Sequence, residues 1–347
     1  MDLKTINELS PSSPCFLLGD ALSVLKRIPT ESIDMVLTSP PYFHKRIYPE
    51  GGIGMEDSME EYIEDLLKVF LEVRRVVKKT GSFWLNIGDS YKDKGLLNLP
   101  YRVAIRMQDE QGWILRNTVI WDKMKGAMTS SRDSLPSGYE PLFHFVKEKN
   151  GYYYNADAAR RKPGSIKVRR GALISPTGIN GICYRKKIRE STELTKEEKK
   201  KAEDALEDVL EKIQKGELLD FRMVIRGAKE RVTNGDDPSL SGRARELRKN
   251  GFYFLFYNPK GSLTSDVWPI LPEDRHRDSL HYAPFPEELP LLPLALTCPE
   301  NGIVLDPFAG TGTTCLAAKK LGRRSIGIDI SREYLRIAKK RCLSGCL

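Results

Sequence analysis

Short apolar segments alternate with longer amphipathic ones over residues 1–149, and the same alternation returns after residue 259. Short apolar runs predict strands, and apolar positions three or four apart predict helices. We predict strands at residues 15–18, 34–37, 82–87, 113–121, 139–146, 252–257, 302–305 and 325–328. We predict helices at residues 21–27, 58–79, 99–112, 195–215, 313–321 and 333–342. Strands that alternate with helices favour a mainly parallel sheet with helices on both faces.

The alternation fades between residues 150 and 258, where the charge pattern changes as well. A helix of mixed charge at residues 195–215 is typical of a solvated face. Residues 160–189 contain no acidic side chain and ten basic ones, namely Arg160, Arg161, Lys162, Lys167, Arg169, Arg170, Arg185, Lys186, Lys187 and Arg189. We therefore predict two halves of one α/β domain, residues 1–149 and 259–347, with a separate region inserted at 150–258.

Composition limits the class of protein. The 347 residues are 40% hydrophobic and 30% charged, enough to bury a large core, and the net charge of +9 favours a polyanionic partner. No apolar run approaches the ~18 residues of a membrane span, and residues 1–13 do not resemble a secretory signal. The six cysteines are scattered without a C-x-x-C pair, which fits a reducing cytosol and favours no metal site. We predict a cytoplasmic protein that does not associate with membranes.

A glycine-rich turn, Asp-Pro-Phe-Ala-Gly-Thr-Gly-Thr-Thr, occupies residues 306–314 between a predicted strand and a predicted helix. Glycines let backbone approach a ligand, and a helix N-terminus adds positive potential. Asp329 ends the next strand 23 residues after Asp306, close to the ~20 expected for an acid that binds a ribose. The turn lacks the third glycine of a dinucleotide site and the lysine of a P-loop. An ordinary tight turn is the alternative.

A second turn, Ser39-Pro40-Pro41-Tyr42, follows the strand predicted at residues 34–37. Two prolines make it rigid, a serine hydroxyl can donate and accept, and the tyrosine offers a flat face for stacking. Such a turn could hold an exocyclic amino group while the ring is clamped; a proline-rich turn without chemistry is the alternative. Only 18 residues follow Asp329, so we expect the remaining strands of the sheet to come from the N-terminal half.

The two turns together resemble motifs I and IV of the β-type amino-methylating DNA methyltransferases. The resemblance covers about residues 16–146 and 265–343 and includes Gly19-Asp20, residues 74–82 and residues 281–286. The cofactor motif comes last in the chain and the Ser-Pro-Pro-Tyr motif first, which is a permuted order. The resemblance implies a permuted Rossmann-like methyltransferase dependent on S-adenosylmethionine, with its target-recognition region in the uncovered middle.

The same resemblance assigns roles to individual residues. It implies that residues 306–313 hold the methionine part of the cofactor, Asp329 the ribose and Asp20 the adenine, while Phe285 helps close the pocket. The implied catalytic residues are Ser39, Pro40, Pro41 and Tyr42. The implied cofactor-binding residues are Asp20, Phe285, Asp306, Pro307, Phe308, Ala309, Gly310, Thr311, Gly312, Thr313 and Asp329. The ten basic residues of 160–189 are the DNA-binding candidates.

A serine as the first residue of motif IV is usual in cytosine-N4 enzymes, and an aspartate in adenine-N6 enzymes. Ser39 therefore implies direct in-line methyl transfer to N4 of a cytosine flipped out of double-stranded DNA, with S-adenosylhomocysteine as the product. Three alternatives stay open: an adenine-N6 enzyme, a non-catalytic nucleic-acid-binding protein on this scaffold, and a methyltransferase acting on small-molecule or protein amines. We further expect a prokaryotic or phage protein, nucleoid-associated, monomeric or homodimeric, with a cognate restriction endonuclease as a candidate partner.

Overall fold

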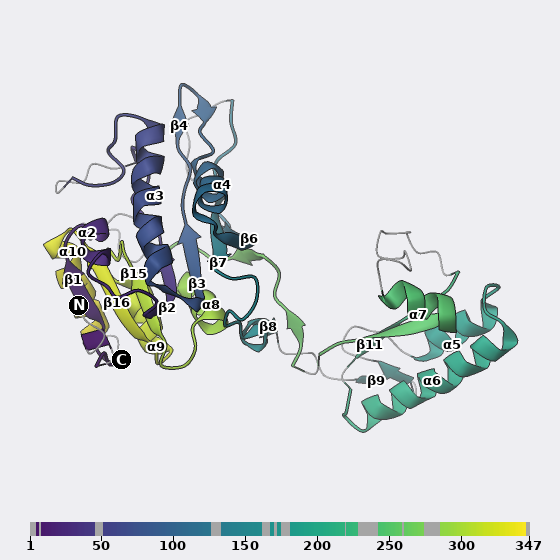
Figure 1. The fold of residues 1–347 in the computed structure, drawn as a ribbon. Coiled ribbons are helices and arrows are strands. Elements are labelled where there is room, and N and C mark those ends of the chain that lie inside the picture. The colour runs from purple at the N-terminus through teal and green to yellow at the C-terminus, as the bar shows by residue number, and fades with distance from the viewer. Residues whose placement is uncertain are drawn as a thin grey trace. The chain divides into compact units, whose positions relative to one another are not determined.

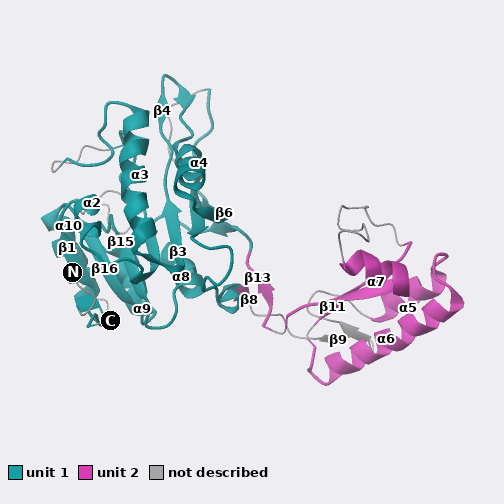
Figure 2. Cartoon of the chain, in the orientation of Figure 1, with its two compact units in different colours: residues 1–159, 265–347 teal, residues 160–264 magenta. Residues whose placement is uncertain are grey.

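The computed structural model describes residues 5–6, 8–45, 51–125, 133–161, 167–169, 172–174, 181–218, 220–227, 242–258, 260–273 and 285–344. The chain forms two compact units (Figure 2): unit 1 comprises residues 1–159 and 265–347, and unit 2 comprises residues 160–264. Residues 150–159, which the sequence pattern assigns to the middle region, belong to unit 1. The backbone N–H of Tyr153 donates to the Thr80 carbonyl (2.8 Å), and that of Asn155 donates to the Leu296 carbonyl (2.7 Å).

Unit 1 is built on one eight-stranded sheet (Figure 1). In spatial order its strands are β1 (Cys15–Leu18), β16 (Arg324–Asp329), β15 (Ile303–Asp306), β2 (Ile33–Thr38), β3 (Val77–Asn86), β7 (Tyr139–Val146), β6 (Ile114–Asp122) and β14 (Val267–Pro269). Only β7 runs antiparallel to its neighbours. The late strands β15 and β16 lie between the early strands β1 and β2, which confirms a mainly parallel sheet completed by N-terminal strands.

Helices cover both faces of the sheet. On one face, α2 (Ala21–Leu25), α3 (Met59–Val76) and α4 (Leu99–Gln111) pack over a core that includes Phe70, Phe83 and Leu305. On the other face, α8 (Glu288–Thr297) and α9 (Thr313–Lys320) pack over Leu37, Trp84 and Val304. The last helix, α10 (Arg332–Ser344), packs beside α9. Alternate residues of a strand point to opposite faces, so these buried strands are apolar on both sides.

Helix α3 begins at the predicted cap, where the Ser58 hydroxyl accepts from the backbone N–H of Glu61 (3.2 Å). It ends at Val76 rather than at residue 79, because Val77 takes extended backbone and starts β3. Gly81 lies inside that strand, not at the predicted break. A Cβ at this position would come within 2.7 Å of the Asp34 carbonyl oxygen, so the glycine permits the close approach of β3 to β2.

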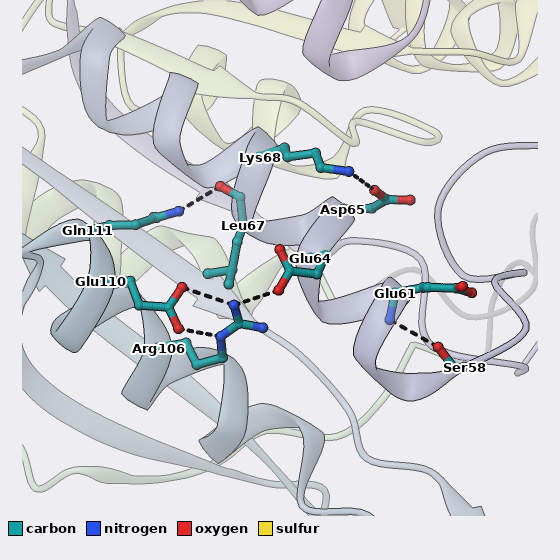
Figure 3. A network of polar contacts seen from close by, with 9 residues as sticks. All are labelled: Ser58, Glu61, Glu64, Asp65, Leu67, Lys68, Arg106, Glu110 and Gln111. Atoms are coloured by element: carbon teal, nitrogen blue, oxygen red, sulfur yellow. Dashed lines mark hydrogen bonds and ion pairs between the residues drawn. The ribbon is translucent and has the colours of Figure 1, made fainter.

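Polar contacts join α3 to α4 at the surface (Figure 3). The Arg106 guanidinium contacts the carboxylates of Glu64 (2.6 Å) and Glu110 (2.5 Å), and the Gln111 amide donates to the Leu67 carbonyl (2.6 Å). Exposed ion pairs contribute only about 0–1 kcal/mol each. The buried apolar faces of the two helices therefore supply most of the stability of this pair.

The described residues of unit 2 form three helices and short strand pairs. Its helices are α5 (Gly181–Glu190), α6 (Lys196–Gln214) and α7 (Gly242–Asn250), and its longest strand pair is β11 (Phe221–Ile225) antiparallel to β12 (Phe252–Phe256). Shorter elements are β8 (Arg160–Arg161) paired with β13 (Ser262–Leu263), and β9 (Lys167–Arg169) paired with β10 (Ala172–Ile174). Ile188, Leu206 and Phe221 lie in its buried core. Unit 1 adds a small hairpin, β4 (Tyr91–Lys92) with β5 (Gly95–Leu96), and the 3-10 helix η1 (Ala156–Ala159).

The described residues contain no helix long and apolar enough to cross a membrane. Within the same residues, no group of three or more His, Cys, Asp or Glu side chains is placed to hold a metal ion.

Candidate active site

The two predicted motifs lie on neighbouring strands. The register pairs Leu18 of β1 with Asp329 of β16, and Asp306 of β15 with Gly327 of β16. Strand β15 also pairs with β2, whose last residue, Thr38, precedes the Ser-Pro-Pro-Tyr turn. Ligands of open α/β sheets bind at the carboxyl ends of parallel strands. The helices that follow β15 and β2 lie on opposite faces of the sheet, which is the switch point where such ligands bind.

Asp306 ties the glycine-rich turn to the end of β2. The Thr38 hydroxyl (2.5 Å) and the backbone N–H of Phe308 (3.0 Å) donate to its Oδ1, and the Thr314 hydroxyl donates to its Oδ2 (2.6 Å). The side chain is buried, and this burial raises its pKa to about 6, although the three donors act in the opposite direction. These three hydrogen bonds fix the shape of the turn at its first residue.

The rest of the turn is held from two sides. The backbone N–H of Ala309 donates to the Ile328 carbonyl (2.8 Å). From α10, the Arg341 guanidinium donates to the carbonyl (2.9 Å) and hydroxyl (2.8 Å) of Thr311 and to the Thr313 hydroxyl (3.2 Å). Gly312 has φ +80°, and a Cβ there would lie 2.8 Å from the Cβ of Ala338. Arg341 was not among the residues predicted from the sequence. The turn itself is largely buried, at residues Pro307, Ala309, Gly310, Thr311, Gly312 and Thr313, and Phe308 is half-buried.

Two carboxylates flank the carboxyl ends of β1 and β16. Asp329 accepts from the backbone N–H groups of Gly310 (2.8 Å) and Ser331 (2.8 Å). Asp20 is exposed and caps α2 by accepting from the N–H of Ser23 (2.9 Å). Beside them, the apolar side chains Leu18 and Ile330 are 43% and 40% exposed. Carboxylates next to exposed apolar side chains fit a nucleoside, which has polar ribose hydroxyls and a flat base whose faces can pack on apolar side chains.

The Ser-Pro-Pro-Tyr turn is fixed by hydrogen bonds. The Ser39 hydroxyl donates to Tyr42 Oη (3.0 Å), and the Tyr42 hydroxyl donates to Glu140 Oε2 (2.8 Å). The Pro41 carbonyl accepts from the Tyr62 hydroxyl (2.9 Å). Pro40 is buried, and no donor among the described residues bonds to its carbonyl oxygen. Burial and the neighbouring Glu140 carboxylate raise the pKa of Tyr42 well above its usual value.

Four further residues complete this site and were not selected from the sequence. Lys123 pairs with Glu140 Oε1 (2.5 Å), and the Asn86 amide donates to Glu140 Oε2 (3.1 Å). Gly88 lies against the Tyr42 ring, because a Cβ there would be 2.5 Å from ring atom Cε2. Lys123, Glu140 and Asn86 stand at the ends of β6, β7 and β3. Polar residues at the ends of predicted strands are a signal that could have found them.

Phe285 is half-buried and packs against the apolar cluster that includes Trp84. Pro286 of the same predicted motif is buried, and residues 281–284 lie outside the described residues.

The DNA-binding candidates of α5 contact other groups of unit 2. Arg185 forms two hydrogen bonds with the Glu207 carboxylate (2.7 and 2.8 Å), and Arg189 pairs with Glu203 (3.0 Å). Both acids belong to α6, the mixed-charge helix whose charged residues were predicted to face solvent. Lys186 lies 3.8 Å from Glu190, and Lys187 lies over the Tyr184 ring.

The other candidates lie in the short strands or between them. The Arg160 guanidinium donates to the Gly261 carbonyl (2.7 Å). Arg161 belongs to β8, and Lys167 and Arg169 belong to β9. Lys162 and Arg170 lie outside the described residues.

The sheet order and the two turns at its carboxyl edge define the fold of an S-adenosylmethionine-dependent methyltransferase. The PvuII DNA methyltransferase, described as cytosine-N4-specific, superposes with a TM-score of 0.55 at 16% identity, covering 97% of this chain and 96% of that chain. A putative DNA modification methylase of Thermus thermophilus, complexed with S-adenosyl-L-methionine, gives a TM-score of 0.51 at 21% identity, covering 96% and 94%.

Sequence comparison places the chain in a family. A family model described as DNA methylase, of the N6/N4 group, matches residues 33–340. The Type II methyltransferase M.SfiI of Streptomyces fimbriatus is 31% identical over 386 aligned residues, covering 93% of this chain and 90% of that protein. M.SmaI of Serratia marcescens is 27% identical over 357, covering 94% and 90%. The chain belongs to the DNA methylase family and is an S-adenosylmethionine-dependent DNA methyltransferase.

Proposed function

We propose that this chain methylates the exocyclic N4 of a cytosine flipped out of duplex DNA at a specific sequence. The observation that carries the proposal is Ser39, which directly follows β2. Thr38, the last residue of β2, bonds to Asp306 at the start of the glycine-rich turn. The name of the PvuII enzyme, which has the same fold, agrees with this choice of target. An adenine-N6 enzyme is the alternative, because the family model includes both activities.

The proposed chemistry uses the acceptor groups of the Ser-Pro-Pro-Tyr turn. The exocyclic nitrogen of cytosine is a weak nucleophile because its lone pair is delocalised into the ring. The Ser39 hydroxyl oxygen and the Pro40 carbonyl oxygen would accept hydrogen bonds from the two N–H groups of this nitrogen. These bonds would favour a tetrahedral nitrogen whose lone pair is no longer delocalised into the ring. Orientation of this kind can contribute ~7–11 kcal/mol to a rate enhancement. Pro41, held through its carbonyl by Tyr62, keeps the turn rigid.

Tyr42 is proposed to stack on the extruded base. Flipping the base out of the duplex costs roughly a few kcal/mol, and stacking on an aromatic side chain offsets ~1–3 kcal/mol of this. Gly88 and Glu140 hold the Tyr42 ring and hydroxyl in place before a base arrives. A side chain that is already fixed loses less conformational entropy on binding.

The cofactor would lie along the carboxyl ends of β1, β16 and β15. We propose that Asp329 binds the ribose hydroxyls, Asp20 the adenine amino group, and residues 306–313 the methionine part, with Phe285 at the edge of the pocket. S-adenosylmethionine supplies an electrophilic methyl group on its sulfonium sulfur. Asp306 and Arg341 hold the glycine-rich turn in shape from behind.

Unit 2 is proposed as the target-recognition region. Its sequence holds 25 basic and 15 acidic side chains, a net charge of +10, whereas unit 1 holds 31 and 32, a net charge of −1. Basic side chains that neutralise phosphates supply much of the affinity for DNA. Besides the candidates in residues 160–189, the exposed cations Arg243, Arg248 and Lys249 of α7 are suited to this role.

One experiment tests the target base and the sequence specificity together. Unmethylated plasmid DNA is incubated with the enzyme and S-adenosylmethionine, and half of it is digested to nucleosides for mass spectrometry. N4-methylcytosine is the expected product, and N6-methyladenine alone would overturn the choice of target. Methylation-aware sequencing of the other half identifies the recognition site. The relatives are Type II methyltransferases, so a restriction endonuclease with the same site is the proposed biological partner.

A further inference from the structure

A chain of three side-chain contacts leads from Lys123 to Ser39. Lys123 Nζ pairs with Glu140 Oε1 (2.5 Å), Glu140 Oε2 accepts from Tyr42 Oη (2.8 Å), and Tyr42 Oη accepts from Ser39 Oγ (3.0 Å). Lys123 directly follows β6, Glu140 is the second residue of β7, and the other two belong to the turn after β2. This series of contacts therefore joins three separate segments of unit 1 at the proposed catalytic turn.

The direction of these hydrogen bonds follows from the chemistry of the groups. An ionised carboxylate can only accept. Glu140 Oε2 (2.8 Å) lies closer to Tyr42 Oη than the other acceptor, Asn86 Oδ1 (3.3 Å), so Tyr42 donates its one proton to Glu140. The Tyr42 oxygen then has only acceptor capacity left for Ser39, and the Ser39 hydroxyl must donate to it. The Ser39 hydrogen is thereby engaged, and the free sites on its oxygen are lone pairs. A target amino group presents hydrogens, so a serine in this state is matched to it.

Three donors surround the Glu140 carboxylate. Its two oxygens face the Lys123 ammonium, the Tyr42 hydroxyl and the Asn86 amide, which donates over 3.1 Å. The side chains of Glu140 and Lys123 are only 14% and 25% exposed, so water screens their attraction less than at the surface. Tyr42, whose pKa is raised, keeps its proton and remains a donor.

We propose that Glu140 is a positioning residue for methyl transfer, which through Tyr42 sets the Ser39 hydroxyl as an acceptor for the hydrogens of the target amino group. Lys123 completes the arrangement by holding the second carboxylate oxygen. Glu140 touches neither base nor cofactor in this scheme. The inference rests on the catalytic role proposed above for Ser39.

The substitution Glu140→Gln separates a role in hydrogen-bond direction from a role in packing. Glu140→Gln has nearly the same shape but only one acceptor oxygen. If that oxygen faces Tyr42, the amide NH2 faces the Lys123 cation, which is unfavourable. If it faces Lys123, the NH2 donates to Tyr42, and the hydrogen-bond direction through Tyr42 to Ser39 reverses. Removing the cation with Lys123→Met lets the amide turn its oxygen to Tyr42 and restores the original direction.

The experiment compares the wild-type chain with E140Q, K123M and the double variant E140Q/K123M. Methyl transfer to unmethylated plasmid DNA is measured with radiolabelled S-adenosylmethionine, giving kcat and the KM for each substrate. Titration calorimetry gives the Kd for S-adenosylmethionine, and thermal unfolding checks folding. Glu110→Gln, which removes an exposed ion pair between α4 residues, is the matched carboxylate control with unchanged kcat.

We expect E140Q to lower kcat at least tenfold while the KM values, the Kd and the melting temperature stay close to wild type. K123M alone should lower kcat by about threefold or less. The double variant should recover most of the activity lost in E140Q. A wild-type kcat in E140Q, or a double variant no more active than E140Q, overturns the inference.

Ser39→Ala, measured in parallel, separates this inference from the proposed function. If Ser39→Ala retains full activity, the proposed catalytic site is wrong. If Ser39→Ala is inactive while E140Q is normal, the site stands and only the role of Glu140 fails.

Discussion

The polar side chains of the two units are organised in different ways. In unit 1, motif residues that are far apart in sequence meet at the carboxyl edge of the sheet, where Thr38 bonds to Asp306 across 268 positions. In unit 2, cations chosen for their charge are paired with acids of a neighbouring helix, as Arg185 is with Glu207. A motif that follows a predicted strand can be placed in the fold, because the carboxyl ends of parallel strands lie along the same edge of the sheet. A count of charges does not reveal which of them are already paired.

The largest expected effect tests the catalytic half of this comparison. Ser39→Ala should lower kcat about a hundredfold or more, the size of effect seen when one group that stabilises a transition state is removed. The Kd for S-adenosylmethionine in calorimetry should stay unchanged, because Ser39 follows β2 and not the cofactor strands. Ser10→Ala, on the surface near the N-terminus, serves as the control. Normal turnover by the Ser39 variant would place the active site elsewhere.

Asp329→Ala tests the cofactor edge of the same unit. Hydrogen bonds to a charged group contribute about 1.5–3 kcal/mol each, so loss of a ribose contact should weaken S-adenosylmethionine binding by roughly 10-fold to 100-fold. At saturating cofactor, kcat should recover much of its wild-type value. Asp329→Asn keeps one acceptor for the Gly310 and Ser331 N–H groups and should lose less affinity. Calorimetry with an unaltered Kd for the alanine variant would refute the assignment.

His144 makes the stability of unit 1 depend on pH. It stacks on Trp84 with ring centroids 4.4 Å apart, and its Nδ1 is buried without a hydrogen-bond partner among the described residues. Burial, together with the charge of Arg116, lowers its pKa from 6.5 to about 3. As the pH falls below 6.5, the unfolded chain binds a proton before the folded chain does. The stability that neutral His144 provides is therefore complete above pH 6.5 and is lost progressively toward pH 3.

Urea unfolding at several pH values measures this loss. Between pH 6.5 and pH 5, His144 should cost the wild-type chain about 1.5 kcal/mol of unfolding free energy. His144→Phe keeps a ring beside Trp84 and should remove that part of the pH dependence, whereas His44→Gln, at an exposed histidine, should not. Parallel pH profiles for wild type and His144→Phe would contradict the assignment.

The same contrast explains which parts of the molecule could be predicted. The mainly parallel sheet, its permuted order and the two turns followed from strand periodicity and from motifs with fixed spacing. The roles of Arg341, Asn86 and Glu140 could not be predicted from the sequence, because they depend on which strand and helix ends meet in space. Helices α5 and α7 were missed as well. Their sequences are rich in charge and have a short apolar face, so their stability comes from packing against other parts of unit 2.

The smallest expected effect compares two helices within unit 2. One variant neutralises Arg185, Lys186 and Arg189 of α5 with glutamine, and the other neutralises Arg243, Arg248 and Lys249 of α7. Both lower the net charge by three, so they differ only in local contacts. We expect the α7 variant to bind duplex DNA less tightly by severalfold. Its slope of log affinity against log salt should fall by up to about 0.9 per lost phosphate contact.

The α5 variant should change the slope by less than the ~0.9 expected for one lost phosphate contact. Arg185 and Arg189 already pair with acids of α6, and Lys186 lies near an acid of its own helix. Those ion pairs are exposed, and an exposed ion pair contributes only about 0–1 kcal/mol. The strength of the pairs alone would therefore not prevent the cations from binding DNA. What limits them is the acid that stays beside each one and repels a phosphate. Fluorescence anisotropy of a labelled duplex across a salt series measures both slopes. A larger change in the α5 variant would mean that DNA displaces the acids of α6 and that the segment of highest charge density is the contact surface after all.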